Sequence, residues 1–153
     1  MKKEFWILII LATIIVVLLC VLIFIPAKPK PAIKESGIVI TSPKANEEIS
    51  IPFKIAGYVA GDGWAGFEGQ VGAVELVQNS MQPNEVMASA ALKATSDWTV
   101  LPTNFEADIS DVSANINIGM NASLIFHNEN PSGDPAKDKT FILPVKIKSY
   151  NVK

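Results

Sequence analysis

His127 is the only histidine in the 153-residue chain, which makes it the first candidate for acid–base chemistry. Ser123 and Ser132 lie near it in the sequence and could supply a nucleophile. A Ser-His-Asp triad or a histidine metal cluster would rest on this one imidazole, however, and neither serine lies in a nucleophile-elbow pattern. Asn128 and Pro131 nearby are typical of a turn. The sequence therefore predicts a protein without catalytic residues.

The acidic residues are numerous but scattered, and Asp134 and Asp138 form the pair best spaced to bind calcium. Calcium prefers carboxylate and carbonyl oxygens, but calcium loops carry a dense alternation of acids. Lys137 intervenes here, so a solvated turn is the better interpretation. We expect neither a metal site nor a bound cofactor.

Trp64, Phe67 and Glu68 form a more informative cluster, in the glycine-rich segment 61–69. Exposed loop aromatics beside an acid are typical of sugar or peptide recognition, because the rings stack on the ligand and the carboxylate orients it. In the alternative interpretation, Trp64 and Phe67 fold back into the core, and Glu68 caps backbone amides. The sequence leaves both interpretations open.

Asp97 and Trp98 form a second acid–aromatic pair, in which an acid of a turn precedes a tryptophan. We expect this tryptophan to lie in the hydrophobic core. The segment 128–134 carries further polar groups that could face the same ligand as the first cluster. The candidate ligand-binding residues are Trp64, Phe67, Glu68, Asn128, Asn130, Ser132 and Asp134.

The elements that must position these residues are predicted to be short strands. Apolar and polar residues alternate between turn signals, over residues 38–41, 49–59, 71–78, 86–95, 104–109, 122–126 and 141–147. Residues 98–101 could extend the sheet, and Pro52 suggests an edge strand or a bulge. The alanine-rich segment 86–95 could form a helix, but its flanking turns favour a strand. About seven strands and no convincing helix predict an all-β, antiparallel sandwich.

Composition excludes several classes of partner and of fold. From residue 37 onward there are eight lysines and thirteen acidic residues, which leaves a formal charge of −5, and the chain has no arginine. Such a domain lacks the basic surface that nucleic acid requires, so we expect no nucleic-acid partner. The single cysteine, Cys20, precedes the domain, which therefore has no internal disulfide and must rely on its core.

Residues 5–25 form an apolar run without charge, proline or glycine, directly after Lys2, Lys3 and Glu4. At about 1.5 Å per residue a helix of this length reaches roughly 30 Å, the thickness of the hydrocarbon core of a bilayer. The run is longer than the apolar core of a cleaved signal peptide, and Cys20 follows two leucines rather than the small residue of a lipoprotein signal. We therefore expect an uncleaved transmembrane signal anchor that contacts the lipid bilayer.

The expected organisation has four parts: a cytoplasmic tail (1–4), the anchor (5–25), a linker (26–36) and an extracytoplasmic domain (37–153). The linker alternates proline with lysine, which favours extended polyproline II structure and a semi-rigid spacer. Flanking lysines are balanced on the two sides of the anchor, so the positive-inside count does not fix the topology. An N-terminal anchor normally exports the chain on its C-terminal side, and we expect the domain outside.

Read in order, the clusters of the domain resemble the Gmad2 family, the immunoglobulin-like domain of bacterial spore germination. The resemblance covers residues 37–148, and its most specific part is Asn-Pro-Ser-Gly-Asp-Pro at 130–135, followed by Asp138 and by Leu-Pro-Val at 143–145. Further matches are the segments 38–43, 55–57, 67–69, 74–76 and 124–126. The motif residues expected to support the fold are Pro43, Gly57, Asp97, Trp98, Phe105, Pro131, Gly133 and Pro144.

This resemblance implies an immunoglobulin-like sandwich at the outer side of a bacterial cell membrane, without enzymatic activity and with a link to germination. We expect a binding or scaffolding module that meets a protein or a glycan of the cell envelope. A protease-inhibitor-like module is the alternative, since a small sandwich can present a rigid loop to a protease. An envelope hydrolase centred on His127 is the remaining alternative.

Overall fold

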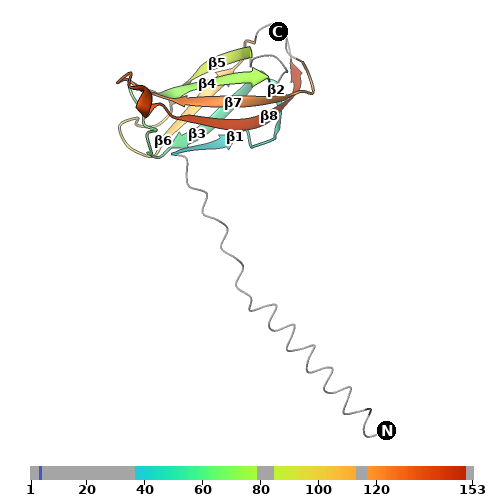
Figure 1. The fold of residues 1–153 in the computed structure, drawn as a ribbon, viewed down its shortest axis with the longest axis horizontal. Coiled ribbons are helices and arrows are strands. Elements are labelled where there is room, and N and C mark those ends of the chain that lie inside the picture. The colour runs from blue at the N-terminus through green and yellow to red at the C-terminus, as the bar shows by residue number, and fades with distance from the viewer. Residues whose placement is uncertain (1–3, 5–36, 79–84, 113–116, 151–153) are drawn as a thin grey trace. The chain divides into compact units, whose positions relative to one another are not determined.

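The computed structural model describes residues 4, 37–78, 85–112 and 117–150. The chain divides into two compact units, residues 1–33 and 34–153. The predicted tail, anchor and linker lie outside the described residues, apart from Glu4. Among the residues that the structure describes, no helix has the length and apolar character needed to cross a membrane. The described part of the second unit is an all-β domain (Figure 1).

Eight strands make up this domain. Their bounds are β1 Ile38–Ser42, β2 Glu48–Ile51, β3 Phe53–Val59, β4 Gln70–Gln78, β5 Glu85–Ala94, β6 Thr103–Ile109, β7 Asn121–Asn128 and β8 Thr140–Tyr150. One short 3-10 helix, Pro135–Lys137, precedes β8. The strand predicted over the alanine-rich segment is confirmed as β5, and no helix replaces it.

All strands belong to one sheet, in the order β1-β3-β6-β5-β4-β7-β8-β2. The neighbouring strands are antiparallel except β2 and β8, which run parallel, so the expectation of a wholly antiparallel arrangement is wrong at this edge. The expected strand over residues 49–59 is divided at Pro52 into β2 and β3, which lie apart in the sheet. Proline has no N–H group to continue a ladder, which explains the interruption.

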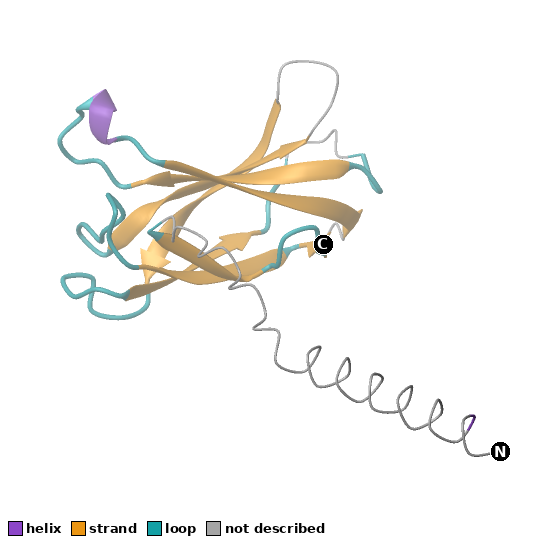
Figure 2. Cartoon of the chain, turned by 60° about the horizontal axis from the view of Figure 1, so that its bottom comes forward, coloured by secondary structure: helices purple, strands orange, loops and turns teal. Residues whose placement is uncertain are grey.

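The sheet is strongly curled, and the chain connection between its edges explains why (Figure 2). Eight strands about 4.8 Å apart would separate the edges of a flat sheet by roughly 34 Å. The two edge strands, β1 and β2, are nevertheless joined by residues 43–47 alone, a link that spans at most about 20 Å. The sheet must therefore bend until its edges approach each other.

Pairing between β5 and β6 is the weakest link in the sheet. Only two residue pairs join these strands, Lys93 with Glu106 and Ala94 with Phe105, whereas β3 and β6 pair over seven. The curled sheet thus consists of a part with β1, β3 and β6 and a part with the other five strands, connected near one end of β5.

The core fills the inside of the curl. In β6, buried and exposed residues alternate without a break, as expected for a strand with one face in the core. The largest fully buried side chains include Trp64, Phe105 and Phe126. Gly57 is required where β3 passes Phe105, because a Cβ atom there would lie 2.8 Å from Phe105 Cζ and would collide with the Val39 carbonyl oxygen. This close approach accounts for Gly57 and Phe105 as motif residues.

Candidate functional site

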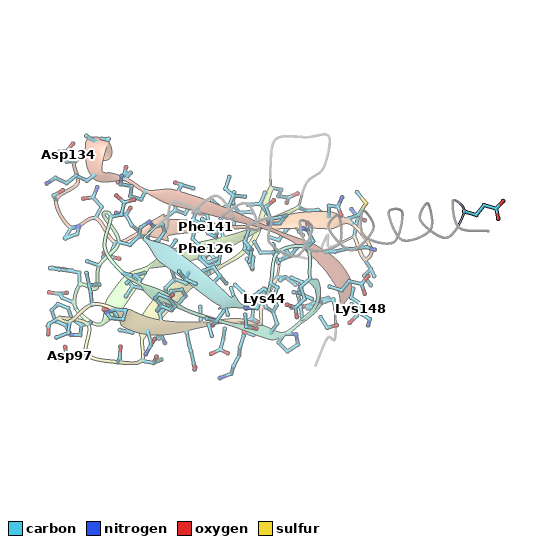
Figure 3. All side chains as sticks on the ribbon, turned by 90° about the horizontal axis from the view of Figure 1, so that it is seen from below. Lys44, Asp97, Phe126, Asp134, Phe141 and Lys148 are labelled. Carbon is cyan, nitrogen blue, oxygen red and sulfur yellow. The ribbon has the colours of Figure 1, made fainter. Side chains whose placement is uncertain are left out.

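Three loops meet at one end of the domain, which we call the loop end: residues 60–69 between β3 and β4, 95–102 between β5 and β6, and 129–139 between β7 and β8. Asp97 and Asp134 mark two corners of this end, and Lys148 lies at the opposite end (Figure 3). The loops are joined by hydrogen bonds. Asn128 Nδ2 donates to the Gly63 carbonyl oxygen at 2.8 Å, and Ala94 N donates to the Gly69 carbonyl oxygen at 2.8 Å.

Trp64 lies in the core beneath the loop end, at 2% exposure. Reciprocal backbone hydrogen bonds between Gly61 and Trp64, of 3.0 and 3.2 Å, close a tight turn that directs the indole inward. Gly61 and Gly63 have φ values of 100° and 85°, which glycine adopts readily. Of the two interpretations of Trp64, the buried one is confirmed, and its ring is not placed to stack on a ligand.

Phe67 and Trp98 lie on the surface instead, exposed by 40% and 38%. Their rings form an edge contact, with centroids 6.5 Å apart and planes at 66°. The expectation that Trp98 lies in the core is wrong. Its loop turns outward because Asp97 Oδ1 accepts hydrogen bonds from Thr99 N and Thr99 Oγ1, at 3.0 and 2.7 Å, which holds residues 97–99 in a turn.

Val100 and Leu101 extend this exposed surface, at 59% and 46% exposure. We call Phe67, Trp98, Val100 and Leu101 the apolar patch. Gly66 lets the two loops approach, since a Cβ atom there would lie 2.6 Å from the Trp98 carbonyl oxygen. Glu68, the predicted orienting acid, is exposed beside Phe67 and has a positive φ of 50°. The expected extension of the sheet over 98–101 is wrong, because these residues form the loop.

The turn of Asp97 also determines its ionisation. The hydrogen bonds from the Thr99 hydroxyl and the Thr99 amide lower the pKa of Asp97 below its ordinary value of 3.8. Both bonds favour the charged carboxylate. Asp97 therefore remains an acceptor within its own loop.

A groove of about 470 Å³ also lies at the loop end, and none of the four patch residues lines it. It is lined by Gly63, Asn128, Glu129, Asn130, Pro131, Ser132, Ala136, Lys137 and Lys139. Three predicted ligand residues, Asn128, Asn130 and Ser132, thus come together in one wall. Asp134 does not line the groove, and the structure does not bring Phe67 or Glu68 into it.

The two asparagines of the groove are engaged in building it. Asn128 Oδ1 accepts from Lys139 N at 2.8 Å, while its Nδ2 donates to the carbonyl oxygens of Gly63 and Lys137. Asn130 Nδ2 donates to the Asp134 carbonyl oxygen at 2.9 Å. These bonds hold the walls of the groove in place, so the asparagines position the site more than they contact a ligand.

The rest of the Asn-Pro-Ser-Gly-Asp-Pro motif closes the same loop. Asn130 Nδ2 also donates to Asp138 Oδ1 at 2.6 Å, and Asn130 Oδ1 accepts from Ser132 Oγ at 2.7 Å. Asp134 Oδ1 accepts from Ala136 N at 3.0 Å and caps the 3-10 helix. Gly133 has a φ of 65°, which accounts for a glycine at this position.

The two candidate calcium ligands thus use their carboxylates within an exposed turn, in agreement with the solvated turn expected there. In the described ranges, no group of three or more histidine, cysteine or acidic side chains could hold a metal ion.

His127 and Ser132, two of the residues considered for catalysis, make separate contacts. His127 Nε2 lies 3.7 Å from Glu75 Oε2, on the neighbouring strand, and both side chains are partly exposed. The Ser132 hydroxyl donates to Asn130, as described above. This arrangement offers no histidine–serine pair in hydrogen-bonding contact at Ser132.

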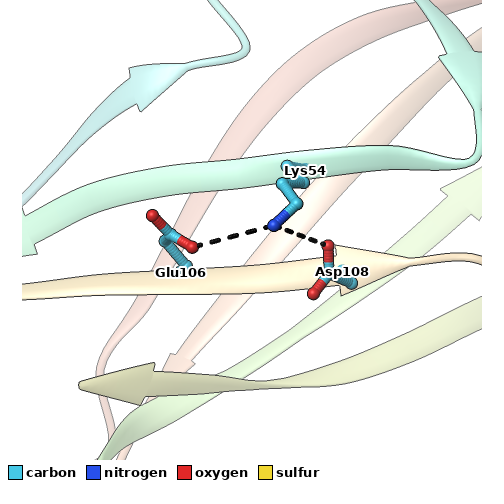
Figure 4. A network of polar contacts seen from close by, with 3 residues as sticks. All are labelled: Lys54, Glu106 and Asp108. Atoms are coloured by element: carbon cyan, nitrogen blue, oxygen red, sulfur yellow. Dashed lines mark ion pairs between the residues drawn. The ribbon is translucent and has the colours of Figure 1, made fainter. Parts of the chain in front are cut away.

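The outer face of β3 and β6 carries a separate charged network (Figure 4). Lys54 Nζ lies 3.7 Å from Asp108 Oδ1 and 4.0 Å from Glu106 Oε2. All three side chains are more than half exposed, so each pair contributes little to stability. We interpret this network as a solvated face of the sheet.

Sequence reasoning missed the lysines and Glu129 of the groove. Lys137 and Lys139 supply the cationic groups, and Glu129 Oε2 accepts from Gln70 Nε2 at 3.0 Å. The pairing of Asn128 with Lys139 helps to bring the two arms of the loop together, and that pairing has no signal in local composition. Comparison with models of known protein families, with curated proteins and with solved structures finds no match.

Proposed function

We propose that this protein is a membrane-anchored, non-catalytic binding module of the bacterial cell envelope, with an immunoglobulin-like extracytoplasmic domain. In the immunoglobulin arrangement, strands A, B and E share one layer with D, and strands C, F and G form the other. The order β1-β3-β6 on one side and β4-β7-β8 on the other supports this assignment. The two-pair connection between β5 and β6 is consistent with two layers.

The proposed location rests on the sequence. The uncharged apolar run 5–25 is long enough to span a bilayer, and the proline-rich linker 26–36 separates it from the domain. The resemblance to Gmad2 supports an outward-facing domain, and a role in germination belongs to this proposal through that resemblance alone.

The groove at the loop end is the observation that carries the proposed binding function. Its volume of about 470 Å³ is within the range of ligand sites. Its walls are held by the hydrogen bond from Asn128 to Gly63, far apart in sequence, and by the local bond from Asn130 to Asp134. Lys137 and Lys139 offer charged donors beside the apolar ring of Pro131. This combination suits a polar segment of an envelope protein or an envelope glycan.

Filling the groove tests this proposal. Ala136 lines the groove, and its backbone N–H, not its methyl group, makes the hydrogen bond to Asp134. Ala136→Trp should therefore block the groove without removing a bond of the loop. Ala45→Trp is the matched control, because Ala45 is exposed in the link between β1 and β2. The purified full chain would be mixed with isolated bacterial sacculi in one arm and with detergent-solubilised envelope proteins in the other.

We expect wild type and Ala45→Trp to bind in one of the two arms, with at least a tenfold loss for Ala136→Trp. Retention in the sacculus arm would identify a glycan, and retention in the protein arm would identify a protein. Equal binding by Ala45→Trp and Ala136→Trp would reject the groove as the site. No binding by wild type in either arm would reject the binding function.

A further inference from the structure

The chain enters the domain at the loop end. Gly37, directly before β1, accepts a hydrogen bond from Ala60 N at 2.7 Å through its carbonyl oxygen. A Cβ atom on Gly37 would lie 2.9 Å from Trp64 Cδ1 and 3.0 Å from Asp62 Cβ, so this residue packs directly against the loop 60–69. The segment that leads to the predicted anchor therefore joins the domain beside the apolar patch.

The length of that segment limits how far the loop end can be from the membrane. The expected linker has eleven residues, 26–36, which reach about 34 Å as polyproline II and roughly 40 Å when fully extended. The end that carries Lys148 is a further strand length away, since β8 has eleven residues and spans roughly 36 Å. If residues 5–25 span the bilayer, the loop end is the end at which the chain from the anchor enters the domain.

The side chains exposed there have the composition of a membrane interface. Trp98 and Phe67 pair edge to face, and the aliphatic Val100 and Leu101 are about half exposed. Tryptophan is enriched at the level of lipid headgroups, and exposed apolar patches commonly mark protein or membrane contacts. A tether also keeps the effective concentration of the membrane high, so a small patch is sufficient for contact.

The charges around the patch determine which lipid surface it fits. The loops 60–69 and 95–102 carry three acids, Asp62, Glu68 and Asp97, and a lysine of the third loop, Lys139, lies against Gly63 on the side of the groove. An anionic leaflet would repel these three carboxylates. Ammonium headgroups would be attracted by the carboxylates and by the faces of the aromatic rings. Electrically neutral lipids that carry an ammonium group, such as phosphatidylethanolamine, therefore fit best.

We propose that the apolar patch of Phe67, Trp98, Val100 and Leu101 rests on the bilayer that holds the chain, on a surface of neutral, ammonium-bearing lipids. This inference rests on the proposed anchor at residues 5–25 but not on the groove. None of the four patch residues lines the groove, so the domain can contact lipid through one and a ligand through the other.

The test uses the full chain in nanodiscs that contain no other protein. Cys20→Ser removes the single native cysteine, and Val100→Cys then carries one environment-sensitive fluorophore in the apolar patch. The matched control carries the same fluorophore at Lys148→Cys, which is exposed at the opposite end. One set of nanodiscs contains phosphatidylcholine and phosphatidylethanolamine, and a second set contains an excess of phosphatidylglycerol. Spin-labelled lipid in both sets quenches fluorophores that reach the headgroups.

We expect quenching at position 100 to exceed that at position 148 at least threefold in neutral nanodiscs, and to fall at least twofold in anionic ones. Adding Trp98→Ser to the Val100→Cys chain should also reduce the quenching, and circular dichroism would confirm that this variant is folded. Equal quenching at both positions in protein that co-purifies with nanodiscs would overturn this inference alone. A membrane-embedded protein would then be the better occupant of the patch. If the protein does not co-purify with nanodiscs, both this inference and the proposed anchor at residues 5–25 would be overturned.

Discussion

Phe67 and Trp98 meet edge to face on the surface of the domain, although they belong to loops that are separated by all of β4 and β5. The buried tryptophan is Trp64, three residues before Phe67. The two tryptophans of the domain thus have opposite roles, one in the core and one on the surface. This difference can be measured.

Replacing each tryptophan by alanine should separate the two roles. We expect Trp64→Ala to lower the free energy of unfolding by about 3–5 kcal/mol, because it leaves a large cavity in the core. Trp98→Ala should lower it by only about 1 kcal/mol, because it removes an exposed aromatic contact. Urea unfolding of the compact unit 34–153, followed by circular dichroism, would measure both. Similar losses for the two variants would contradict the assigned positions.

Two glycines should respond to alanine for different reasons. Gly57→Ala places a Cβ atom against the Val39 carbonyl oxygen and Phe105 Cζ, and we expect a loss of about 1–3 kcal/mol from this overpacking. Gly133 has open space around it but a φ of 65°, so Gly133→Ala should cost about 1–2 kcal/mol through backbone strain. Shortening Phe105 to leucine should relieve part of the first penalty and none of the second. Urea unfolding would be measured for Gly57→Ala and for Gly133→Ala, each combined with Phe105→Leu. Stability should be partly regained only in the first combination.

Asn130 should control the order of the loop that forms the groove. Asn130→Asp removes the Nδ2 donor and places a second carboxylate next to Asp138 Oδ1, now 2.6 Å from Asn130 Nδ2. We expect faster hydrogen exchange of the Gly133 amide, which donates to the Asn130 carbonyl oxygen at 3.2 Å. Ser132→Ala is the control: it removes the donor to Asn130 Oδ1 and the 3.4 Å acceptor of Asp134 N, but it leaves both bonds of Asn130 Nδ2 in place and should change this exchange less. Unchanged exchange of the Gly133 amide in Asn130→Asp would show that the side-chain amide of Asn130 does not hold the loop.

The loop of Asp97 should loosen in acid. Because the pKa of Asp97 is lowered in the folded protein, its contribution to stability is fully present above the ordinary value of 3.8 and is lost as the pH falls through the lower, folded pKa. The carboxyl and Thr99 amide resonances should titrate together, with a midpoint below 3.8. Thr99→Val removes the hydroxyl donor, which is the larger cause of the shift, and should raise this midpoint. A midpoint at or above 3.8 in wild type would exclude the proposed hydrogen bonds.

Local patterns were sufficient to predict the strands but not their partners. Alternation identified β6 because its buried and exposed residues follow a strict period of two. The parallel pairing of β2 with β8 joins residues about a hundred positions apart, and no local signal encodes it. Pro52 correctly indicated an irregularity, but not that the chain crosses there between distant strands of the curled sheet.

The candidate site was predicted in part for similar reasons. Composition predicted loops near Trp64 and Asn130 that carry candidate binding residues, since glycine, proline and asparagine mark turns. Whether a tryptophan of such a turn points inward depends on backbone bonds like those between Gly61 and Trp64. The groove depends on the hydrogen bond from Asn128 to Gly63, across 65 positions of sequence. Spacing within one segment cannot show such contacts.

The edge strands β1 and β2 are the shortest of the sheet, with five and four residues. Pro43 follows β1 directly and Pro52 follows β2, so neither strand can be continued at its C-terminal end by a residue with an N–H donor. Long, flat edges invite strands of other molecules to add to them and start aggregation. The proposed anchor at residues 5–25 would concentrate the protein in two dimensions and increase this hazard. The short, proline-terminated edges would let many copies crowd together on one surface without joining into fibres.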